Sequence, residues 1–476
     1  MEKKTIFAII FLFTIIFTVG CNKNKKESTT TNTVTTTAEH VHEFGSWIEL
    51  SKPTCSEEGF RKRVCSCGIS ETEILPRTEH TFSNDKCDVC NYERLTEGFS
   101  IYYSQIDNMY HINDYNGDSK TVRIPYLYDD GTNGEHKIYI DKNSVDDAYE
   151  STLKNAKIEK IIIGSGYQTI EKNTFLGLNN LMEVVIESEN VTQIGDNAFY
   201  NCPKLSKITF VNTIEKIGFY AFAGCDFKEI ELPYNLKILG NGVFSDNENL
   251  SKITYYNLNE IGDNAFSNTA LSEIRIPYTL SYFGFQGKMS SLTKFTIDAR
   301  NTIFEYSNGC LINKETNSLV KCISSSVSIP ENIVELYPYS LSYLDFSDIA
   351  KVVIPESVKY VGFRAFYNTK LSDIDLGKIE EIDENSLSNI IFVDSDSISI
   401  VLPETLKQIE YHAFQNLVCN EVVIPISVTK VGSAIFEGCK VTSIKIHSTT
   451  TKLDDCDDNW DYGIDDTITT IYIIDD

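Results

Sequence analysis

The chain has 476 residues, of which 42% are hydrophobic and 11% aromatic, so it is long enough to bury an extensive core. Its formal net charge at pH 7 is −26, from 68 acidic and 42 basic side chains. This excess of negative charge argues against nucleic acids and anionic membrane surfaces as direct binding partners.

Residues 1–21 predict a lipoprotein export signal. Two lysines precede an apolar run at 6–19, which is followed by Gly20 and Cys21. A charged start, an apolar stretch and a small residue are typical of a secretory signal, and the run is too short for a membrane-spanning helix. The ending resembles a bacterial lipobox, which implies a diacylated Cys21 at the mature N-terminus, although Thr18 replaces the usual Leu. The alternative is ordinary signal cleavage with Cys21 incidental.

Residues 22–37 are rich in Lys, Ser and Thr and predict a polar tether. The following segment, 38–95, is rich in Cys and His and predicts a small zinc-ribbon-like module. Thiolates and imidazoles form the tetrahedral ligand set of structural Zn²⁺, and so short a segment needs such a staple. The candidate zinc ligands are Cys55, Cys65, Cys67, His80, Cys87 and Cys90, with His42 as a further candidate.

The module contains a faint duplication. His42 stands two residues before a Phe and leads to Cys65 and Cys67, and His80 likewise leads to Cys87 and Cys90. The module resembles small Cys-rich modules on surface proteins of Gram-positive bacteria. Disulfides would also account for the cysteines, because an exported protein can form them, although five cysteines leave one unpaired. Reduced thiols are a further alternative, and a catalytic metal site is the least favoured.

Residues 96–155 contain many tyrosines in short alternating runs and predict a β-rich N-terminal cap. From 156 to 476 one phrase returns every 21 to 27 residues, as in Gln193-Ile-Gly-Asp-Asn-Ala-Phe199 and Tyr360-Val-Gly-Phe-Arg-Ala-Phe366. A fixed period in this range indicates a solenoid. We therefore predict about twelve coils of ~23 residues that stack into a parallel sheet.

Each repeat reads as a strand, a turn and a short helical segment. Alternating runs such as 271–276 predict strands with one buried face, and several end at a proline, which cannot continue the hydrogen-bonded ladder. The glycine after each Ile or Val is expected to permit a turn. The Ala-Phe that follows predicts a short helical or 3₁₀ turn that places Phe in the core.

These repeats resemble the BspA-type leucine-rich repeats, and Glu356-Ser-Val-Lys-Tyr-Val-Gly-Phe-Arg-Ala-Phe366 follows that pattern almost residue for residue. The resemblance implies a leucine-rich-repeat solenoid, with an elongated coil at about 298–335 where the period breaks and a closing coil at the C-terminus. Cys310 and Cys322 could pair across a hairpin there, but unpaired thiols are the favoured prediction. Cys202, Cys225 and Cys439 recur at one repeat position and are expected to be free and buried.

No nucleophile elbow, zinc-protease motif, phosphate loop or dinucleotide fingerprint occurs, so we expect no enzymatic activity. The solvent-facing repeat positions show no evident aromatic stripe that would mark a binding site. The family resemblance implies a lipid-anchored surface protein that recognises host matrix proteins or partner cells. Two competing hypotheses are an envelope scaffold that binds the bacterium's own surface components and a zinc-capturing lipoprotein.

Overall fold

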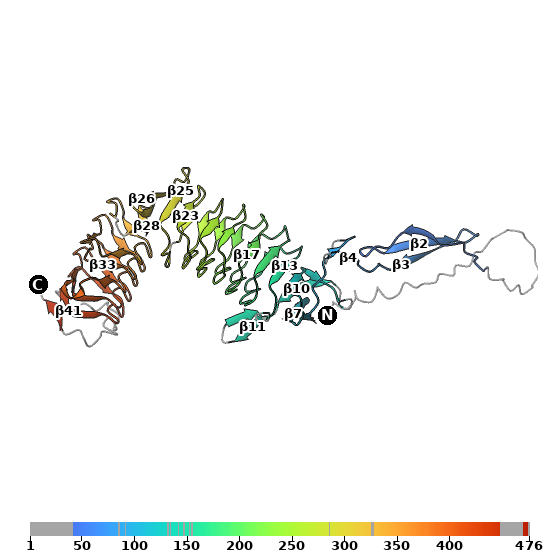
Figure 1. The fold of residues 1–476 in the computed structure, drawn as a ribbon, viewed down its shortest axis with the longest axis horizontal. Helices are drawn as coiled ribbons and strands as arrows, with labels where there is room; N and C mark the ends of the chain where they lie inside the picture. The colour runs from blue at the N-terminus through green and yellow to red at the C-terminus, as the bar shows by residue number, and fades with distance from the viewer. Residues whose placement is uncertain are drawn as a thin grey trace, which may run out of the picture. The chain divides into compact units, whose positions relative to one another are not determined.

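The computed structural model describes residues 41–474 except 84–85, 91, 131–132, 134, 141, 146–147, 152, 154–155, 285, 325–327 and 448–469. The predicted signal with Cys21 and the tether at 22–37 lie outside the described residues. The chain divides into two compact units, Met1–Tyr92 and Glu93–Asp476 (Figure 1). Among the described residues, no helix is long and apolar enough to cross a membrane.

The first unit is a thin antiparallel structure. Strands β1 (Ile48–Ser51), β2 (Gly59–Val64) and β3 (Ser70–Leu75) form one sheet, and β4 (Phe82–Ser83) pairs with β5 (Lys86–Cys87). Arg61 pairs with Glu73 at 2.7 Å across β2 and β3, and the ring of Trp47 lies under the Arg61 guanidinium. Such exposed ion pairs contribute little to stability, so this unit depends on other interactions.

The second unit opens with a mixed four-stranded sheet in the predicted cap, in the order β6 (Phe99–Ser104), β7 (Met109–Tyr115), β10 (His136–Ile140) and β9 (Leu127–Tyr128). A hairpin of β11 (Lys142–Val145) and β12 (Ala148–Ser151) follows. Strand β8 (Thr121–Ile124) already pairs in parallel with β13 (Lys160–Ile163). The solenoid sheet therefore begins inside the segment predicted to be only a cap.

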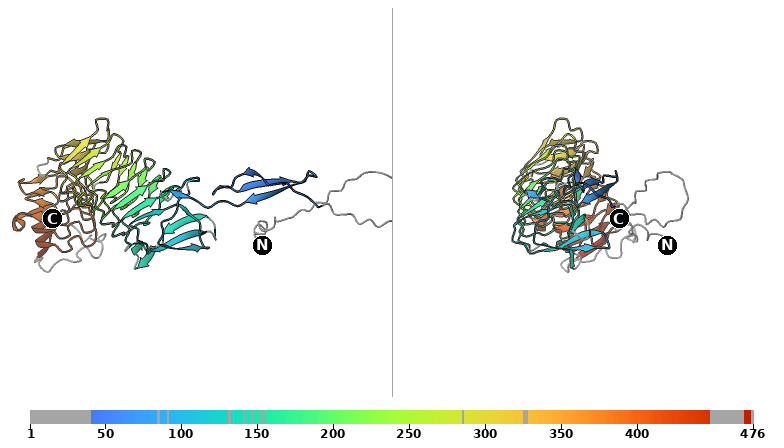
Figure 2. Two further views of the ribbon diagram at one scale, coloured as in Figure 1. Left: turned by 45° about the vertical axis from the view of Figure 1, so that its right-hand side comes forward. Right: turned by 90° about the vertical axis from the view of Figure 1, so that its right-hand side faces the viewer.

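The rest of this unit is a solenoid of about 13 turns, with parallel strands stacked in chain order (Figure 1, Figure 2). The fold class predicted from the sequence is confirmed. One set of strands, at the Ile-rich alternating runs, comprises β13, β15 (Glu183–Ile186), β17 (Lys207–Thr209), β19 (Glu229–Glu231), β21 (Lys252–Thr254), β23 (Glu273–Ile276), β25 (Lys294–Ile297), β31 (Val352–Val353), β34 (Ile374–Asp375), β37 (Ser399–Val401), β39 (Val418–Ile424), β41 (Lys440–His447) and β42 (Thr470–Ile474).

A second set consists of two-residue strands, seven of which directly precede the repeated glycine. The set comprises β14 (Thr169–Ile170), β16 (Gln193–Ile194), β18 (Lys216–Ile217), β20 (Ile238–Leu239), β22 (Glu260–Ile261), β24 (Tyr282–Phe283), β29 (Glu335–Leu336), β32 (Tyr360–Val361), β35 (Glu381–Ile382), β38 (Gln408–Ile409) and β40 (Lys430–Val431). In the C-terminal half of the chain, a third stack of short strands has the order β30 (Asp345–Phe346), β33 (Lys370–Leu371) and β36 (Ile391–Phe392), and β36 pairs with β39.

The core consists of two hydrophobic clusters that divide within residues 304–322, and in each cluster the coils bury side chains against one another. The rings of Phe175, Phe199, Phe222, Phe244 and Phe266 stack nearly parallel, with successive centroids 5.2, 5.3, 5.7 and 6.4 Å apart. Burying a large apolar side chain contributes about 1.5–3 kcal/mol, which one coil alone cannot obtain. Stacking of neighbouring coils is therefore what stabilises each repeat.

The repeated glycine serves close packing rather than an unusual turn. A Cβ atom on Gly240 would lie 2.6 Å from the carbonyl carbon of Gly218 in the preceding coil, and one on Gly432 would lie 2.5 Å from the Tyr411 nitrogen. Neither glycine has a positive φ angle. The prediction that this glycine permits a turn was wrong in its reason: the backbones of successive coils approach too closely for any side chain.

The predicted helical segment at Ala-Phe is also wrong in detail. Residues 197–201 form turns in which Asn197 and Asn201 have φ angles of 53° and 56°. Asn tolerates this left-handed conformation, which interrupts a helix. The backbone N–H groups of Asn197, Phe199 and Asn201 instead donate to carbonyls of the next coil. In the described residues the single helix is the 3₁₀ turn η1 (Ser395–Ser397).

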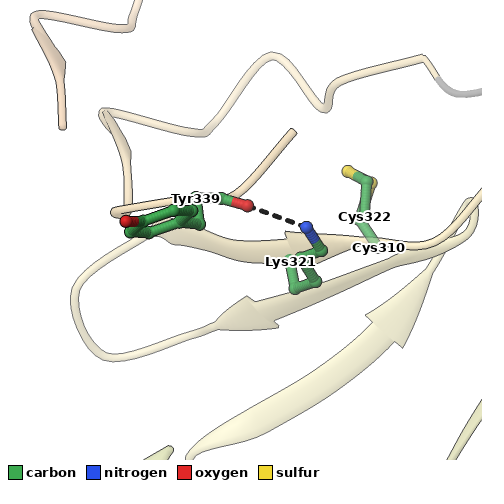
Figure 3. Close-up of a disulfide and its surroundings, with 4 residues drawn as sticks. All are labelled: Cys310, Lys321, Cys322 and Tyr339. Atoms are coloured by element: carbon green, nitrogen blue, oxygen red, sulfur yellow. Dashed lines mark hydrogen bonds between the residues drawn. A yellow bond between two sulfur atoms is a disulfide. The ribbon is translucent and has the colours of Figure 1, made fainter. Parts of the chain in front are cut away.

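The break in period corresponds to an antiparallel meander of β26 (Phe304–Ser307), β27 (Cys310–Asn313) and β28 (Ser318–Cys322). Cys310 and Cys322 face each other in register on β27 and β28 and form a disulfide (Figure 3). The favoured prediction of unpaired thiols was therefore wrong here. By contrast, Cys202, Cys225 and Cys439 are free and buried, as predicted.

Lys321 lies beside this disulfide with its ammonium group inside the unit (Figure 3). Its Nζ donates hydrogen bonds to the carbonyl oxygens of Tyr339 and Ser342 and to the Ser342 hydroxyl, at 2.8–3.1 Å. Burial lowers the pKa of Lys321 to about 7. A cation in this position ties the meander to the following coil through two backbone carbonyls.

Candidate functional site

The first unit contains a cluster of four potential metal ligands: Cys55, His80, Cys87 and Cys90. Strand β5 and the turn after it supply Cys87 and Cys90, and His80 lies just before β4. The four ligand atoms all lie within 4.8 Å of one another. The Sγ atoms of Cys55 and Cys87 are 3.5 Å apart, and Cys90 Sγ is 3.4 Å from His80 Nδ1.

Backbone geometry prepares one of these thiols to act as a thiolate. Hydrogen bonds from the backbone amides of Cys90 and Val89 lower the pKa of Cys87 to about 6, although burial opposes the effect. The pKa of Cys55 is raised, chiefly by burial. Cysteine ligands must lose their protons to bind a metal ion, so the lowered pKa of Cys87 favours binding of a cation at this cluster.

A second cluster contains His42, Cys65 and Cys67. The hairpin that joins β2 and β3 carries both cysteines, and Gly68 turns the chain there with a φ angle of 91°. Cys67 Sγ lies 3.1 Å from Cys65 Sγ and 3.2 Å from His42 Nδ1. A disulfide requires about 2.05 Å between sulfur atoms, so these two thiols are close but are not joined by a disulfide.

All seven candidate ligands from the sequence thus fall into clusters, but into two clusters rather than one site. A set of three thiols and one imidazole fits tetrahedral Zn²⁺, for which Zn–S and Zn–N bonds of about 2.3 and 2.0 Å are usual. The second cluster supplies the same kinds of ligand. The residues present fit zinc at both places, and the assignment of the metal itself is a proposal developed below.

The solenoid carries an exposed aromatic row that sequence reasoning missed. Tyr234, Tyr256 and Tyr278 stand 22 residues apart, each in the turn that leads from a longer strand to a two-residue strand. Tyr234 and Tyr278 are 56% and 45% exposed. The rings of Tyr234 and Tyr256 lie 5.3 Å apart, and the Arg300 guanidinium lies 4.2 Å from the centre of the Tyr278 ring. We call these four residues the tyrosine row.

Carboxylates hold two members of the tyrosine row in place. The Tyr256 hydroxyl donates to Glu231 at 2.6 Å, which raises the Tyr256 pKa. The Arg300 guanidinium donates to both carboxylate oxygens of Asp298, at 3.0 and 2.9 Å. These contacts limit the side-chain freedom that binding would otherwise have to restrict. The row is therefore an ordered amphipathic surface with one member in each coil.

A cleft of about 500 Å³ lies between the cap and the first coils. Ile124, Ile138, Ile163 and Phe175 contribute apolar walls, and the Lys137 ammonium lies 5.3 Å from the centre of the Tyr126 ring. Among the described residues that line it, none is Cys, His, Ser or Asp. The cleft combines this apolar surface with the ionisable side chains of Lys137, Glu171 and Lys172.

Comparison with known families identifies the repeats. Six copies of the BspA type leucine-rich repeat region match segments 134–218, 168–291, 291–391 and 386–456, which together cover more than half of the chain. The chain belongs to the BspA-type leucine-rich repeat family. The turn geometry, the stacked Phe residues and the close-packed glycines described above are how this particular sequence builds that repeat.

Two solved structures share the fold of this BspA-type protein. A leucine-rich cell surface protein from Faecalibacterium prausnitzii A2-165 is 22% identical, with a TM-score of 0.56, over 78% of this chain and 99% of its own. The pneumococcal vaccine antigen PcpA is 18% identical, with a TM-score of 0.51, over 80% of this chain and 100% of its own. No curated protein matches the sequence.

Proposed function

We propose that this BspA-type protein is exported, held at the outer face of a membrane by a lipid on Cys21, and recognises other proteins through its solenoid. The observation that carries the proposal is the tyrosine row on an extended repeat scaffold. Tyr and Arg are enriched among the residues that dominate protein–protein binding energies. An exposed row of these types is otherwise unexplained, because the stacking of coils uses the buried positions.

The spacing of the row favours a protein ligand that runs along the solenoid. Parallel strands lie about 4.8 Å apart, so each coil presents the next Tyr or Arg one strand spacing further on. Tyr supplies a rigid apolar face and a hydroxyl at low entropic cost, and Arg300 adds a planar cation. A partner that lies across several coils would contact both apolar and polar groups, and the solenoid backbone would not need to change its conformation.

A surface location agrees with the two structural neighbours, of which one is a cell surface protein and the other a vaccine antigen. The export signal and the lipobox-like ending support the same location for this chain. We favour adhesion to host matrix proteins or partner cells, and we propose no catalytic role. Recognition of the bacterium's own envelope proteins is the competing hypothesis.

Solid-phase binding of the full mature chain to matrix proteins and to neighbouring bacterial cells tests this function. Binding at micromolar concentration supports adhesion, whereas a pull-down that recovers only proteins of the native envelope supports the competing scaffold role. The anchor is tested by metabolic labelling with palmitate in the native host. Wild-type chain should take up the label and Cys21→Ala should not, and an unlabelled wild type would contradict the lipid anchor.

A further inference from the structure

The two cysteine clusters of the first unit repeat one local arrangement. The His42 and Phe44 rings lie 5.8 Å apart at 45°, and the His80 and Phe82 rings lie 5.8 Å apart at 42°. Phe44 pairs with Cys65 across an antiparallel bridge, as Phe82 pairs with Cys87. Both clusters thus combine a histidine, a phenylalanine that pairs with a cysteine across antiparallel backbone, and a second cysteine in the turn that follows.

In both clusters, the same imidazole atom approaches the second cysteine of the pair. His42 Nδ1 lies 3.2 Å from Cys67 Sγ, and His80 Nδ1 lies 3.4 Å from Cys90 Sγ. Ligand atoms around a tetrahedral Zn²⁺ lie about 3.3–3.8 Å apart, given the usual Zn–N and Zn–S bond lengths. Sulfur pairs at 3.1 and 3.5 Å are near this spacing and well beyond a disulfide bond of about 2.05 Å.

The first unit has almost no other core. Four of its described residues are buried, and three of these are Cys55, Cys65 and Cys87; the fourth is Gly59. Its larger apolar side chains face solvent instead, such as Ile48 at 61% and Ile74 at 56% exposure. A segment this short without an apolar core requires a cross-link or a bound metal ion to fold. The buried positions, where apolar side chains would otherwise form the core, are mostly cysteines.

We propose that the first unit binds two zinc ions, one in a centre of Cys55, His80, Cys87 and Cys90, and one in a centre that includes His42, Cys65 and Cys67. The two ions are the core of this unit, and its fold depends on them. Cys55 comes from the loop between β1 and β2 and joins the hairpin after β4, so the first centre also links the two antiparallel parts of the unit. The inference is independent of the function proposed for the solenoid.

Metal content of the full chain, purified without chelators, tests the proposal directly. We expect two zinc ions per chain, and one after either Cys87→Ser/Cys90→Ser or Cys65→Ser/Cys67→Ser. The matched control His136→Gln, which changes a histidine outside both clusters, should retain two. A wild-type content of one or none would overturn the proposal. So would an unreduced mass spectrum that shows disulfides among the five cysteines of the clusters.

Cobalt substitution tests whether the cysteines bind a metal ion directly or only contribute to the fold as thiols. The thiolate-to-Co²⁺ absorption of the wild type should arise from five thiolates, and Cys55→Ser should lower it by about one fifth because that cysteine belongs to one centre only. An unchanged spectrum in Cys55→Ser would remove Cys55 from the centre and contradict the division of ligands proposed here.

The dependence of the fold on the ions has its own optical signal. The chain has two tryptophans, and the guanidinium groups of Arg61 and Arg63 lie 4.7 and 4.6 Å from the centre of the Trp47 ring. In the variant Trp460→Phe, the remaining emission reports on this unit. Chelation should shift that emission to longer wavelength and leave the far-UV spectrum of the solenoid nearly unchanged. Emission that stays constant after both ions are removed would contradict the proposal.

Discussion

Lys321 places a titratable cation in the interior of the elongated coil, where 4% of its surface is exposed. Its pKa is lowered from 10.5 to about 7 because burial disfavours the charged form. Between these two values the unfolded chain holds a proton that the folded chain has lost. Lys321 therefore makes the folded state more stable as the pH rises above 7. Below pH 7 the folded state bears the full free-energy cost of burying the charged side chain.

We predict that the free energy of unfolding of the wild type rises relative to that of Lys321→Met by about 1 kcal/mol per pH unit between pH 7.5 and 9.5. Urea unfolding followed by far-UV circular dichroism measures it. The comparison is needed because buried thiols such as Cys202, with a pKa raised to about 12 by burial, act in the opposite direction above about pH 9. If the free energies of unfolding of the two proteins change in parallel with pH, the pKa of Lys321 is not lowered in the folded state.

The repeated glycines make a second prediction at this scale. Gly240→Ala would place a methyl group 2.6 Å from a backbone carbon of the preceding coil, and the coils must move apart to accept it. Overpacking of this kind costs about 1–3 kcal/mol, so the urea midpoint should fall clearly. Lys237→Ala, an exposed change in the same coil, is the control and should stay within about 0.5 kcal/mol. Equal midpoints would refute close packing as the role of the glycine.

At the scale of elements, the disulfide joins β27 to β28 and closes a loop with a sequence separation of 12. A cross-link of this size stabilises by about 2–4 kcal/mol, mainly through the unfolded chain. Cys310→Ser/Cys322→Ser should lower the free energy of unfolding of the solenoid by that amount, and a reductant should have no further effect on the variant. A variant as stable as the oxidised wild type would show that the cross-link contributes nothing.

Much of this element-level organisation could be predicted from the sequence, because the strands and the buried Phe positions follow directly from a repeated pattern. The break near 298–335 indicated an irregular coil for the same reason. The pairing of Cys310 with Cys322 could not be read in this way, since it depends on strand register, which a one-residue shift would change. The left-handed Asn residues were missed because Asn-Ala-Phe also suits a helical turn.

The candidate sites likewise could be predicted only in part from the sequence. Each candidate zinc ligand was visible as a Cys or His at short spacing. Their division into two clusters depends on which strands pair, and Cys55 lies beside Cys87 only because of the fold. The tyrosine row was in principle visible as three Tyr residues 22 apart. It was overlooked because the next coil carries Arg300 at this position, and the exposure of a turn residue is set by how the coils stack.

At the scale of the molecule, the two units differ in the kind of side chain that they bury. The solenoid buries apolar side chains in two clusters, with Phe stacked on Phe through several successive coils. The buried residues among those described in the first unit are Cys55, Cys65, Cys87 and Gly59. The stacking positions carry Phe or Leu and specify the scaffold, so recognition is expected to depend on the positions that stacking leaves free, and above all on the tyrosine row.

The most direct test of this account measures binding by the tyrosine row. Full mature chain, Tyr234→Ala/Tyr278→Ala and the control Tyr282→Ala, an equally exposed tyrosine on β24, are titrated against immobilised matrix proteins and intact bacterial cells. We predict that at least one partner binds the wild type at micromolar concentration, that the double variant binds at least about tenfold more weakly, and that the control changes less than about twofold. Absence of any partner, or equal binding by the double variant, would contradict recognition through this surface.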